Sequence, residues 1–300
     1  MTGPSGGPVG VVGLGVMGRL IASRLHEHGV QVVVFDVNPD AVSEAADRGM
    51  TAVESAAEVA ARCPVVVLSL PTPAVVRSVV DELATASPGP MVLDTSTIGP
   101  DTAQGCRERL AEIGGDYADC PILGRPESVG SWTIPVGGTP AAAATAEEVL
   151  APVARRVVRV GEVGAAATLK VLNNLMLGAI NAVTAEVLVL SQASGLDPAV
   201  FVDTVVDSGA ASVSGLFKDV GPRAVSGDFR PTFSLELMGK DNGLALELAD
   251  RHRVPMPVGR AAQLLNTMGL AAGLGGQDSI AVVRVLEQLT GHRVGAGQGM

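Results

Sequence analysis

The sequence predicts an α/β domain with a doubly wound, mainly parallel sheet, followed by an all-helical domain that a long helix joins to it. In the first half of the chain, short runs of valine and leucine alternate with helical segments, which is typical of strands buried on both faces. After Gly164 no convincing strand pattern remains, and an apolar helical segment begins. A length of 300 residues with 47% hydrophobic residues suits two domains, since domains usually have ~100–200 residues. We expect them at residues 1–162 and 163–300.

The elements follow this division in order. In the first domain we expect strands at residues 9–12, 31–35, 65–70, 91–94, 116–119 and 133–137, with helices at 19–28, 39–48, 55–62, 73–84 and 100–113. In the second domain we expect helices at residues 165–193, 198–208, 234–252, 259–274 and 278–291. The helices between the strands require crossover connections, so neighbouring strands should run parallel.

A glycine motif follows the first predicted strand. Its spacing is Gly13-x-Gly15-x-x-Gly18, the fingerprint of a Rossmann dinucleotide-binding turn. The first glycine allows the tight turn, the second lets the backbone approach a pyrophosphate, and the third lets the helix pack closely on the strand. The candidate cofactor-binding loop is therefore Gly13, Leu14, Gly15, Val16, Met17 and Gly18. The alternative is a tight turn between strand and helix in another α/β fold.

Asp36 ends the second predicted strand, 21 residues after Gly15. An acidic residue at this distance accepts hydrogen bonds from the ribose hydroxyls of NAD and repels the 2′-phosphate of NADP. The residues that follow, Val37, Asn38 and Pro39, offer no arginine for a phosphate. We therefore predict NAD as the cofactor rather than NADP.

Composition excludes several classes of function. A net charge of −10 argues against nucleic acid or an anionic membrane as a partner. The apolar stretch 171–190 contains Asn173, Asn174, Asn181 and Glu186, so a buried helix is expected there rather than a membrane span. The three cysteines show no metal-binding spacing, and no signal peptide is visible, so we expect a cytoplasmic protein without a metal.

The long helix carries the sharpest candidate for chemistry. Lys170, Asn174 and Asn181 fall within about 40° of one another on a helix of 100° per residue. A polar stripe on an otherwise apolar helix must face water, a partner or a ligand, because unpaired buried polar groups are costly. The alternative is a lysine whose ammonium reaches solvent at a domain boundary, with asparagines bonded to neighbouring backbone.

Two further segments are weaker candidates. Gly239-Lys240-Asp241-Asn242 lies inside a predicted helix, where the alternative is solvated surface. Asp94-Thr95-Ser96-Thr97 leaves the end of a strand, where the alternative is an ordinary helix cap. Cys120 is expected in the core, since no histidine is paired with it, and none of the four histidines is expected to act as a catalytic base.

Four motifs occur together in one order: Gly13-Leu-Gly15-Val-Met-Gly18, Asp94-Thr-Ser-Thr97-Ile-Gly-Pro100, Gly161-x-x-Gly164-x5-Lys170-x2-Asn173-Asn174, and Lys240-Asp241. This combination, spread over nearly the whole chain, resembles the β-hydroxyacid dehydrogenases, which include 3-hydroxyisobutyrate dehydrogenase and tartronate semialdehyde reductase. The resemblance implies a Rossmann domain, an all-α domain, and a homodimer or tetramer. It implies hydride transfer between a nicotinamide cofactor and a small hydroxyacid or semialdehyde.

The resemblance also implies roles for individual residues. Lys170 would be the catalytic acid or base, and Asn174 would hold both Lys170 and the substrate. The remaining expected site residues are Thr97, Lys240, Leu70 and Pro71 beside the cofactor, and Thr97, Gly124, Arg125 and Asp241 beside the substrate. Two other functions stay open: an imine reductase on the same fold, a group that typically lacks the lysine, and a non-catalytic NAD-binding protein.

One segment departs from the family pattern. The family usually has Asp-Ala-Pro-Val-Ser-Gly-Gly, whose hydroxyl and backbone bind the substrate carboxylate, whereas this chain has Asp119-Cys-Pro-Ile-Leu123-Gly124-Arg125. The hydroxyl is lost at Leu123 and a cation appears at Arg125. The guanidinium of Arg125 could bind a carboxylate with two parallel hydrogen bonds, or it could point to solvent. The departure puts the usual small hydroxyacid substrate in question.

Overall fold

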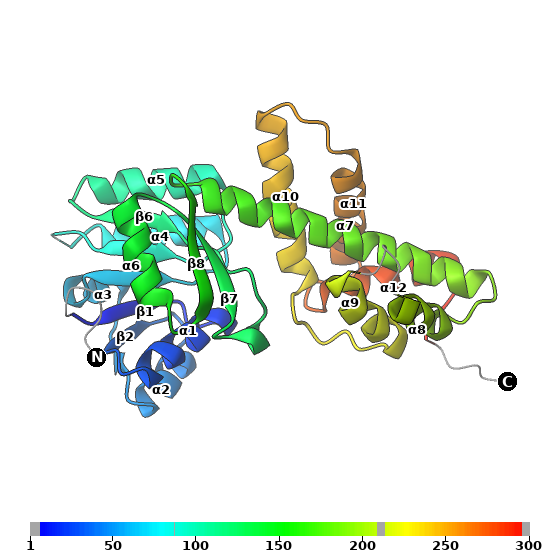
Figure 1. Ribbon diagram of the computed structural model, residues 1–300, viewed down its shortest axis with the longest axis horizontal. Coiled ribbons are helices and arrows are strands. Elements are labelled where there is room, and N and C mark those ends of the chain that lie inside the picture. Colours follow the sequence, from blue (N-terminus) through cyan, green and yellow to red (C-terminus); the bar gives the residue numbers. More distant parts are fainter. Residues whose placement is uncertain (1–6, 87, 209–213, 296–300) are drawn as a thin grey trace. The chain divides into compact units, whose positions relative to one another are not determined.

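The computed structural model describes residues 7–86, 88–208 and 214–295 (Figure 1). The chain forms two compact units, residues 1–171 and 172–300. The division falls inside one continuous helix, α7 (Ala165–Ala193). Lys170 therefore belongs to the first unit and Asn174 to the second.

The first unit is built on one eight-stranded sheet with the order β3-β2-β1-β4-β5-β6-β7-β8. The strands are β1 (Val9–Val12), β2 (Val32–Phe35), β3 (Thr51–Ala52), β4 (Val65–Leu68), β5 (Met91–Asp94), β6 (Asp116–Asp119), β7 (Trp132–Gly137) and β8 (Ala154–Gly161). Among the described strand pairs only β6 and β7 run antiparallel. The predicted doubly wound, mainly parallel sheet is confirmed, with strand order reversing between β1 and β4.

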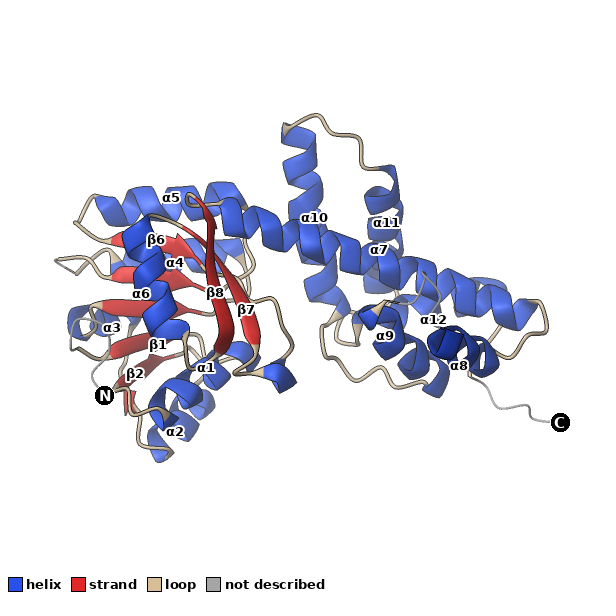
Figure 2. Ribbon diagram, in the orientation of Figure 1, coloured by secondary structure: helices blue, strands red, loops and turns tan. Residues whose placement is uncertain are grey.

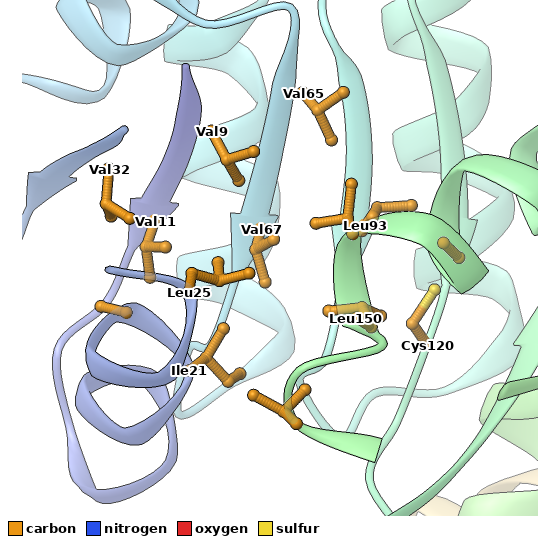
Figure 3. Packing of buried hydrophobic residues seen from close by; sticks show 14 of the residues in the cluster. Val9, Val11, Ile21, Leu25, Val32, Val65, Val67, Leu93, Cys120 and Leu150 are labelled. Carbon is orange, nitrogen blue, oxygen red and sulfur yellow. The ribbon is translucent and has the colours of Figure 1, made fainter. Parts of the chain in front are cut away.

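Helices cover both faces of this sheet (Figure 2). They are α1 (Val16–Glu27), α2 (Pro39–Asp47), α3 (Ala56–Arg62), α4 (Pro73–Leu83), α5 (Pro100–Ala111) and α6 (Pro140–Leu150), with a short 3₁₀ helix, η2 (Pro126–Ser128). Side chains of α1 and α6 enter one buried apolar cluster, and those of α3, α4 and α5 enter another on the opposite face. Figure 3 shows Ile21 and Leu25 of α1 lying against Val11 and Val67 of the sheet.

The sequence patterns miss two strands and one α-helix of the first unit, besides the short η2. Strand β3 has only two residues, too few for any periodicity. Strand β8 is an edge strand in which Arg155, Arg156 and Arg159 are exposed, so it lacks the apolar run of a buried strand. Helix α6 is rich in alanine and begins at Pro140, where Thr139 accepts a hydrogen bond from the Ala142 N–H, a regular N-terminal cap.

The described residues of the second unit form helices joined by loops, with one isolated bridge between Ser234 and Asp278. After α7 come α8 (Pro198–Ser208), α9 (Gly215–Ser226), α10 (Leu235–Arg251), α11 (Pro257–Ala271), the 3₁₀ helix η3 (Ser279–Ala281) and α12 (Val282–Thr290). The predicted all-α domain is confirmed. Helix α9 escapes the sequence patterns because Gly221 and Pro222 lie inside it, and both residues normally oppose a helix.

Helix α7 is the one described helix that is long and apolar enough to cross a membrane by length and composition. Half of its most apolar window is buried within the protein. A core helix of a globular protein passes the same test, so this property alone does not indicate a membrane span.

Candidate active site

The glycine loop lies between β1 and α1, and its geometry explains each glycine. Gly13 has a φ of 93°, and a Cβ there would lie 2.3 Å from the Ser69 carbonyl oxygen. A Cβ on Gly18 would lie 1.8 Å from the carbonyl oxygen of Gly13. At Gly15 an added Cβ would meet none of the described residues within 4 Å. The open side of the loop is thus at Gly15, where a phosphate can approach the backbone.

The start of α1 suits an anion. Gly15 is the N-cap and supplies no side-chain cap, and the first turn contains no acidic residue. The first N–H groups of a helix have no partner within the helix, and they carry the positive end of its dipole. The loop can therefore receive a pyrophosphate, as the fingerprint predicts.

Asp36 lies directly beside this loop, after the end of β2. Its Oδ2 accepts a hydrogen bond of 2.5 Å from the Leu14 N–H, and its Oδ1 accepts one of 2.7 Å from the Asn38 N–H. The carboxylate thus holds the glycine turn and presents a negative charge next to it. That charge opposes an anionic group brought directly against the carboxylate, after the end of β2.

The loops after β4 and β5 are tied together by hydroxyl groups. Ser96 Oγ accepts a hydrogen bond of 2.8 Å from the Leu70 N–H, and Thr95 Oγ1 donates one of 2.6 Å to the Leu68 carbonyl. Gly99, which has no side chain, is the N-cap of α5, so the hydroxyls of Thr95 and Ser96 serve the neighbouring loop rather than this helix. Thr97 is half-buried in the same loop.

Asp94, the last residue of β5, holds the loop that follows this strand. It is buried, and it accepts hydrogen bonds from the Ser96 N–H at 2.8 Å and from the Tyr117 hydroxyl at 2.6 Å. Burial raises the pKa of the Tyr117 hydroxyl well above its ordinary value, and the Asp94 carboxylate adds to the effect. Tyr117 therefore stays protonated as the donor to Asp94.

Lys170 lies in the second turn of α7 and reaches the segment that departs from the family pattern. Its Nζ donates a hydrogen bond of 2.7 Å to the Ile122 carbonyl, and the side chain is half-buried. This contact joins the predicted catalytic lysine to the loop at the carboxyl end of β6, within the first unit. Ligands of open parallel sheets bind at that edge.

The departing segment is held against β7. A Cβ on Gly124 would lie 2.2 Å from Trp132 Cδ1, and the Trp132 indole N–H donates to the Arg125 carbonyl at 2.7 Å. The Ser128 hydroxyl also donates to the Arg125 carbonyl, at 2.9 Å. The backbone of Arg125 is therefore fixed, while Gly124 and Arg125 are both exposed.

The second unit brings three other predicted residues together. Asn174 is 3% exposed, and its Nδ2 donates a hydrogen bond of 2.5 Å to Asp241 Oδ2. The Lys240 ammonium lies 2.9 Å from Asp241 Oδ1. Asp241 is only 1% exposed, and its carboxylate contacts both Asn174 and Lys240. A direct contact of Asp241 with the substrate stays a prediction.

Asn181, the last residue of the predicted polar stripe, has a structural partner. Its Nδ2 donates a hydrogen bond of 2.7 Å to the Ser279 hydroxyl in η3. The stripe therefore divides along α7. Lys170 contacts the loop after β6, Asn174 contacts Asp241, and Asn181 contacts Ser279 in η3.

The cysteines and histidines take no part in this arrangement. Cys63, Cys106 and Cys120 are free and buried, and burial raises the pKa of Cys63 and Cys106 to about 12. Such thiols are poor nucleophiles. Of the histidines, His26 is half-buried and His28, His252 and His292 are exposed. Among the described residues, no three His, Cys, Asp or Glu side chains group to hold a metal ion.

A glycine loop at the carboxyl edge of a parallel sheet, with a lysine on the helix that follows the sheet, defines a nicotinamide-dependent oxidoreductase of the Rossmann type. Residues 8–161 match the family model for the NAD binding domain of 6-phosphogluconate dehydrogenase. Residues 164–286 match the model for NAD-binding of NADP-dependent 3-hydroxyisobutyrate dehydrogenase. The chain belongs to the β-hydroxyacid dehydrogenase family.

Curated relatives match over nearly their whole length. The chain is 34% identical to 2-(hydroxymethyl)glutarate dehydrogenase of Eubacterium barkeri, covering 97% of this chain and 98% of that protein. It is 34% identical to 3-sulfolactaldehyde reductase of Escherichia coli, covering 96% and 97%. It is 30% identical to human mitochondrial 3-hydroxyisobutyrate dehydrogenase, covering 94% and 87%.

The comparison with solved structures supports the same family. A 3-hydroxyisobutyrate dehydrogenase from Mycobacterium tuberculosis matches with a TM-score of 0.85 and 30% identity, covering 93% of this chain and 99% of that one. An imine reductase from Pseudomonas sp., at 21% identity and a TM-score of 0.57, covering 93% and 99%, shares the fold only. The predicted family, the oxidoreductase activity on CH–OH groups and the nicotinamide cofactor are confirmed.

Proposed function

We propose that the protein transfers a hydride between NAD(H) and a small hydroxyacid or semialdehyde, with Lys170 as general acid–base. The observation that supports this most is the Lys170 ammonium held 2.7 Å from the Ile122 carbonyl at the carboxyl edge of the sheet. When bound, the nicotinamide supplies or accepts the hydride. Lys170 then gives a proton to the developing alkoxide in reduction, or takes it from the alcohol in oxidation.

We assign the neighbouring residues supporting roles. Asn174 holds the substrate hydroxyl. Asp241 fixes the side-chain amide of Asn174 through the 2.5 Å hydrogen bond. Thr97 and Lys240 line the nicotinamide end, and Leu70 and Pro71 lie in the loop beside the cofactor. Gly13 to Gly18 hold the pyrophosphate, and Asp36 holds the adenosine ribose. The Asp36 charge beside the glycine turn supports NAD rather than NADP as the preferred cofactor.

The acid group of the substrate would meet the segment from Leu123 to Arg125. Arg125 is an exposed residue on a fixed backbone, which supports binding of an anionic group there by its guanidinium; extension of the side chain into solvent is the alternative. The names of the relatives describe short substrates that carry carboxylate or sulfonate groups. We therefore propose a short anionic aldehyde or hydroxyacid as the substrate class.

Two other functions make different predictions. An imine reductase would reduce cyclic imines and would not need Lys170, and a non-catalytic NAD-binding protein would turn over nothing. The test measures oxidation of NADH and NADPH with a panel of semialdehydes, 2-keto acids and cyclic imines, with Lys170→Ala alongside. We expect turnover of acidic semialdehydes that Lys170→Ala abolishes. Imine reduction that survives Lys170→Ala would support the imine reductase instead.

We also propose a homodimer or tetramer in the cytoplasm. On α7 an apolar stripe is left exposed, formed by Leu172, Met176, Val183 and Leu190, which are four or seven residues apart and so share one helix face. An exposed apolar stripe of this kind favours association with a second copy.

The three free, buried cysteines suit a reducing compartment. The domain limits 1–162 and 163–300 stay a prediction.

A further inference from the structure

We infer that Asp119 is a positioning residue for Lys170, because it caps the helix that carries this lysine. The inference rests on the proposed role of Lys170. Asp119 is the last residue of β6 and is 1% exposed. Its Oδ1 accepts a hydrogen bond of 2.8 Å from the Gly164 N–H, and its Oδ2 accepts one of 2.6 Å from the Ala167 N–H. Gly164 directly precedes α7, and Ala167 lies in its first turn.

A carboxylate is chemically suited to this place. The first N–H groups of a helix have no partner within it, and their dipoles favour a negative charge. Asp119 satisfies one of them at Ala167 with one oxygen and the N–H of the preceding Gly164 with the other, so neither oxygen can be replaced by a donor group without loss. Burial raises the pKa of this carboxyl group, and the hydrogen bonds from Gly164 and Ala167 act in the opposite direction.

The surroundings are shaped to the carboxylate. Asp119 pairs with Gly137 across the antiparallel contact between β6 and β7. A Cβ on Gly137 would lie 2.4 Å from Asp119 Oδ1 and 2.7 Å from Oδ2, distances that real Cβ atoms essentially never show. Gly164 has a φ of 95°, a conformation that suits glycine and turns its N–H into the cap. Gly137 thus leaves room for the Asp119 side chain, whereas a Cβ on Gly164 would meet Pro100 instead.

The cap reaches Lys170 through one helical turn. Ala167, which donates to Asp119, precedes Lys170 by three residues, and Lys170 returns to Ile122, three residues after Asp119. The segments 119–122 and 167–170 are therefore joined at both ends. Without the Asp119 carboxylate, the first turn of α7 loses its hydrogen bond to the end of β6. The Lys170 Nζ then loses its fixed position at the edge of the sheet. A displacement of about 1 Å at a reacting group can cost roughly a hundredfold in rate.

Asp119→Asn tests the inference with the shape of the side chain preserved. Its amide keeps one acceptor oxygen but turns an NH₂ group toward the second N–H. We expect kcat to fall by roughly tenfold to a hundredfold, with the dissociation constant for NADH, measured by fluorescence titration, unchanged. The matched control is Thr139→Ala, which removes the side-chain cap of α6 in the same unit and should leave kcat unchanged.

A double variant separates positioning from a general structural effect. If Asp119 acts through Lys170, Asp119→Asn should add nothing to the loss of kcat caused by Lys170→Ala. The single Lys170→Ala variant and the double variant are compared with methylamine present in both assays, which restores measurable turnover. Gly137→Ala, which displaces the carboxylate without removing it, should show the same pattern and serves if Asp119→Asn fails to fold. The inference would be overturned if folded Asp119→Asn and folded Gly137→Ala both kept the wild-type kcat. It would also be overturned if Asp119→Asn lowered kcat as much in the Lys170→Ala background as in the wild type. Full activity of Lys170→Ala would instead refute the proposed function.

Discussion

Asp36 holds the glycine turn, and we propose that the same side chain selects the cofactor. Its two oxygens accept hydrogen bonds from the N–H groups of Leu14 and Asn38, so the charge proposed to oppose a 2′-phosphate also fixes the glycine turn. Removing the charge should therefore weaken NADH binding while relieving repulsion of NADPH.

We expect Asp36→Asn to lower the ratio of kcat/KM for NADH over NADPH by about tenfold or more, equivalent to roughly 1.4 kcal/mol. Initial rates with each cofactor measure this ratio. Asp40→Asn, which removes an exposed acid four residues further on, is the matched control and should keep the ratio. A ratio that does not change in Asp36→Asn would show that another group selects the cofactor.

At the scale of the residue, the sequence predicts side chains that belong to local motifs and misses those whose partners are distant. The glycine loop and the Lys170–Asn174 spacing are visible because their geometry depends on residues close in the chain, and Asp36 is visible because it follows Gly15 at the 21-residue distance typical of the fingerprint. The cap of Asp119 on α7 joins residues 45 and 48 positions apart. The contact of Lys170 with Ile122 spans 48 positions, and no periodicity encodes such a contact.

At the scale of the element, α7 combines a buried polar side with an exposed apolar stripe. Gly178 marks a close approach on the buried side, because a Cβ there would lie 2.3 Å from Asn242 Nδ2. Asn242 is itself fully buried in α10. A side chain at position 178 would thus separate α7 from α10, near the contact between Asn174 and Asp241.

We expect Gly178→Ala to lower the free energy of unfolding by about 1–3 kcal/mol, the usual cost of overpacking. Gly105→Ala in α5 is the matched control, since its Cβ would meet nothing within 4 Å among the described residues. It should raise the free energy of unfolding by roughly 0.5–1 kcal/mol, because alanine favours a helix interior. Urea unfolding of both variants checks the pair, and two changes of the same sign would contradict this account of α7.

The elements that the sequence misses share a physical cause. Strand β8 and helix α9 are stabilised by tertiary contacts that override poor local patterns, namely the pairing of β8 with β7 and the packing of Phe217 and Val220 in the helical core. The long, regular α7 is predicted from residue 165 to 193 and observed with the same limits. Strong periodicity over many residues is the feature that local patterns encode best.

At the scale of the whole molecule, the proposed assembly depends on the stripe along α7. Glutamate in place of Val183 or Met176, both more than half exposed, would put a charge into the face of a second copy. We expect each variant to shift the particle mass measured by light scattering toward the monomer while the circular dichroism stays native.

Leu289→Glu is the control for this prediction, since it places the same charge on an exposed apolar residue at the end of α12. It should leave the assembly intact. A wild-type protein that is monomeric at micromolar concentration would contradict the proposal, and so would variants that keep the oligomer.

The central claim is that Lys170 handles the proton that accompanies hydride transfer. The most direct measurement is a single-turnover experiment in which the decay of NADH fluorescence is followed after mixing the enzyme–NADH complex with an acidic semialdehyde. Lys170→Met should slow this decay by roughly a hundredfold to ten-thousandfold, the usual contribution of a positioned acid, while NADH binds as in the wild type. A decay as fast as that of the wild type would contradict the claim.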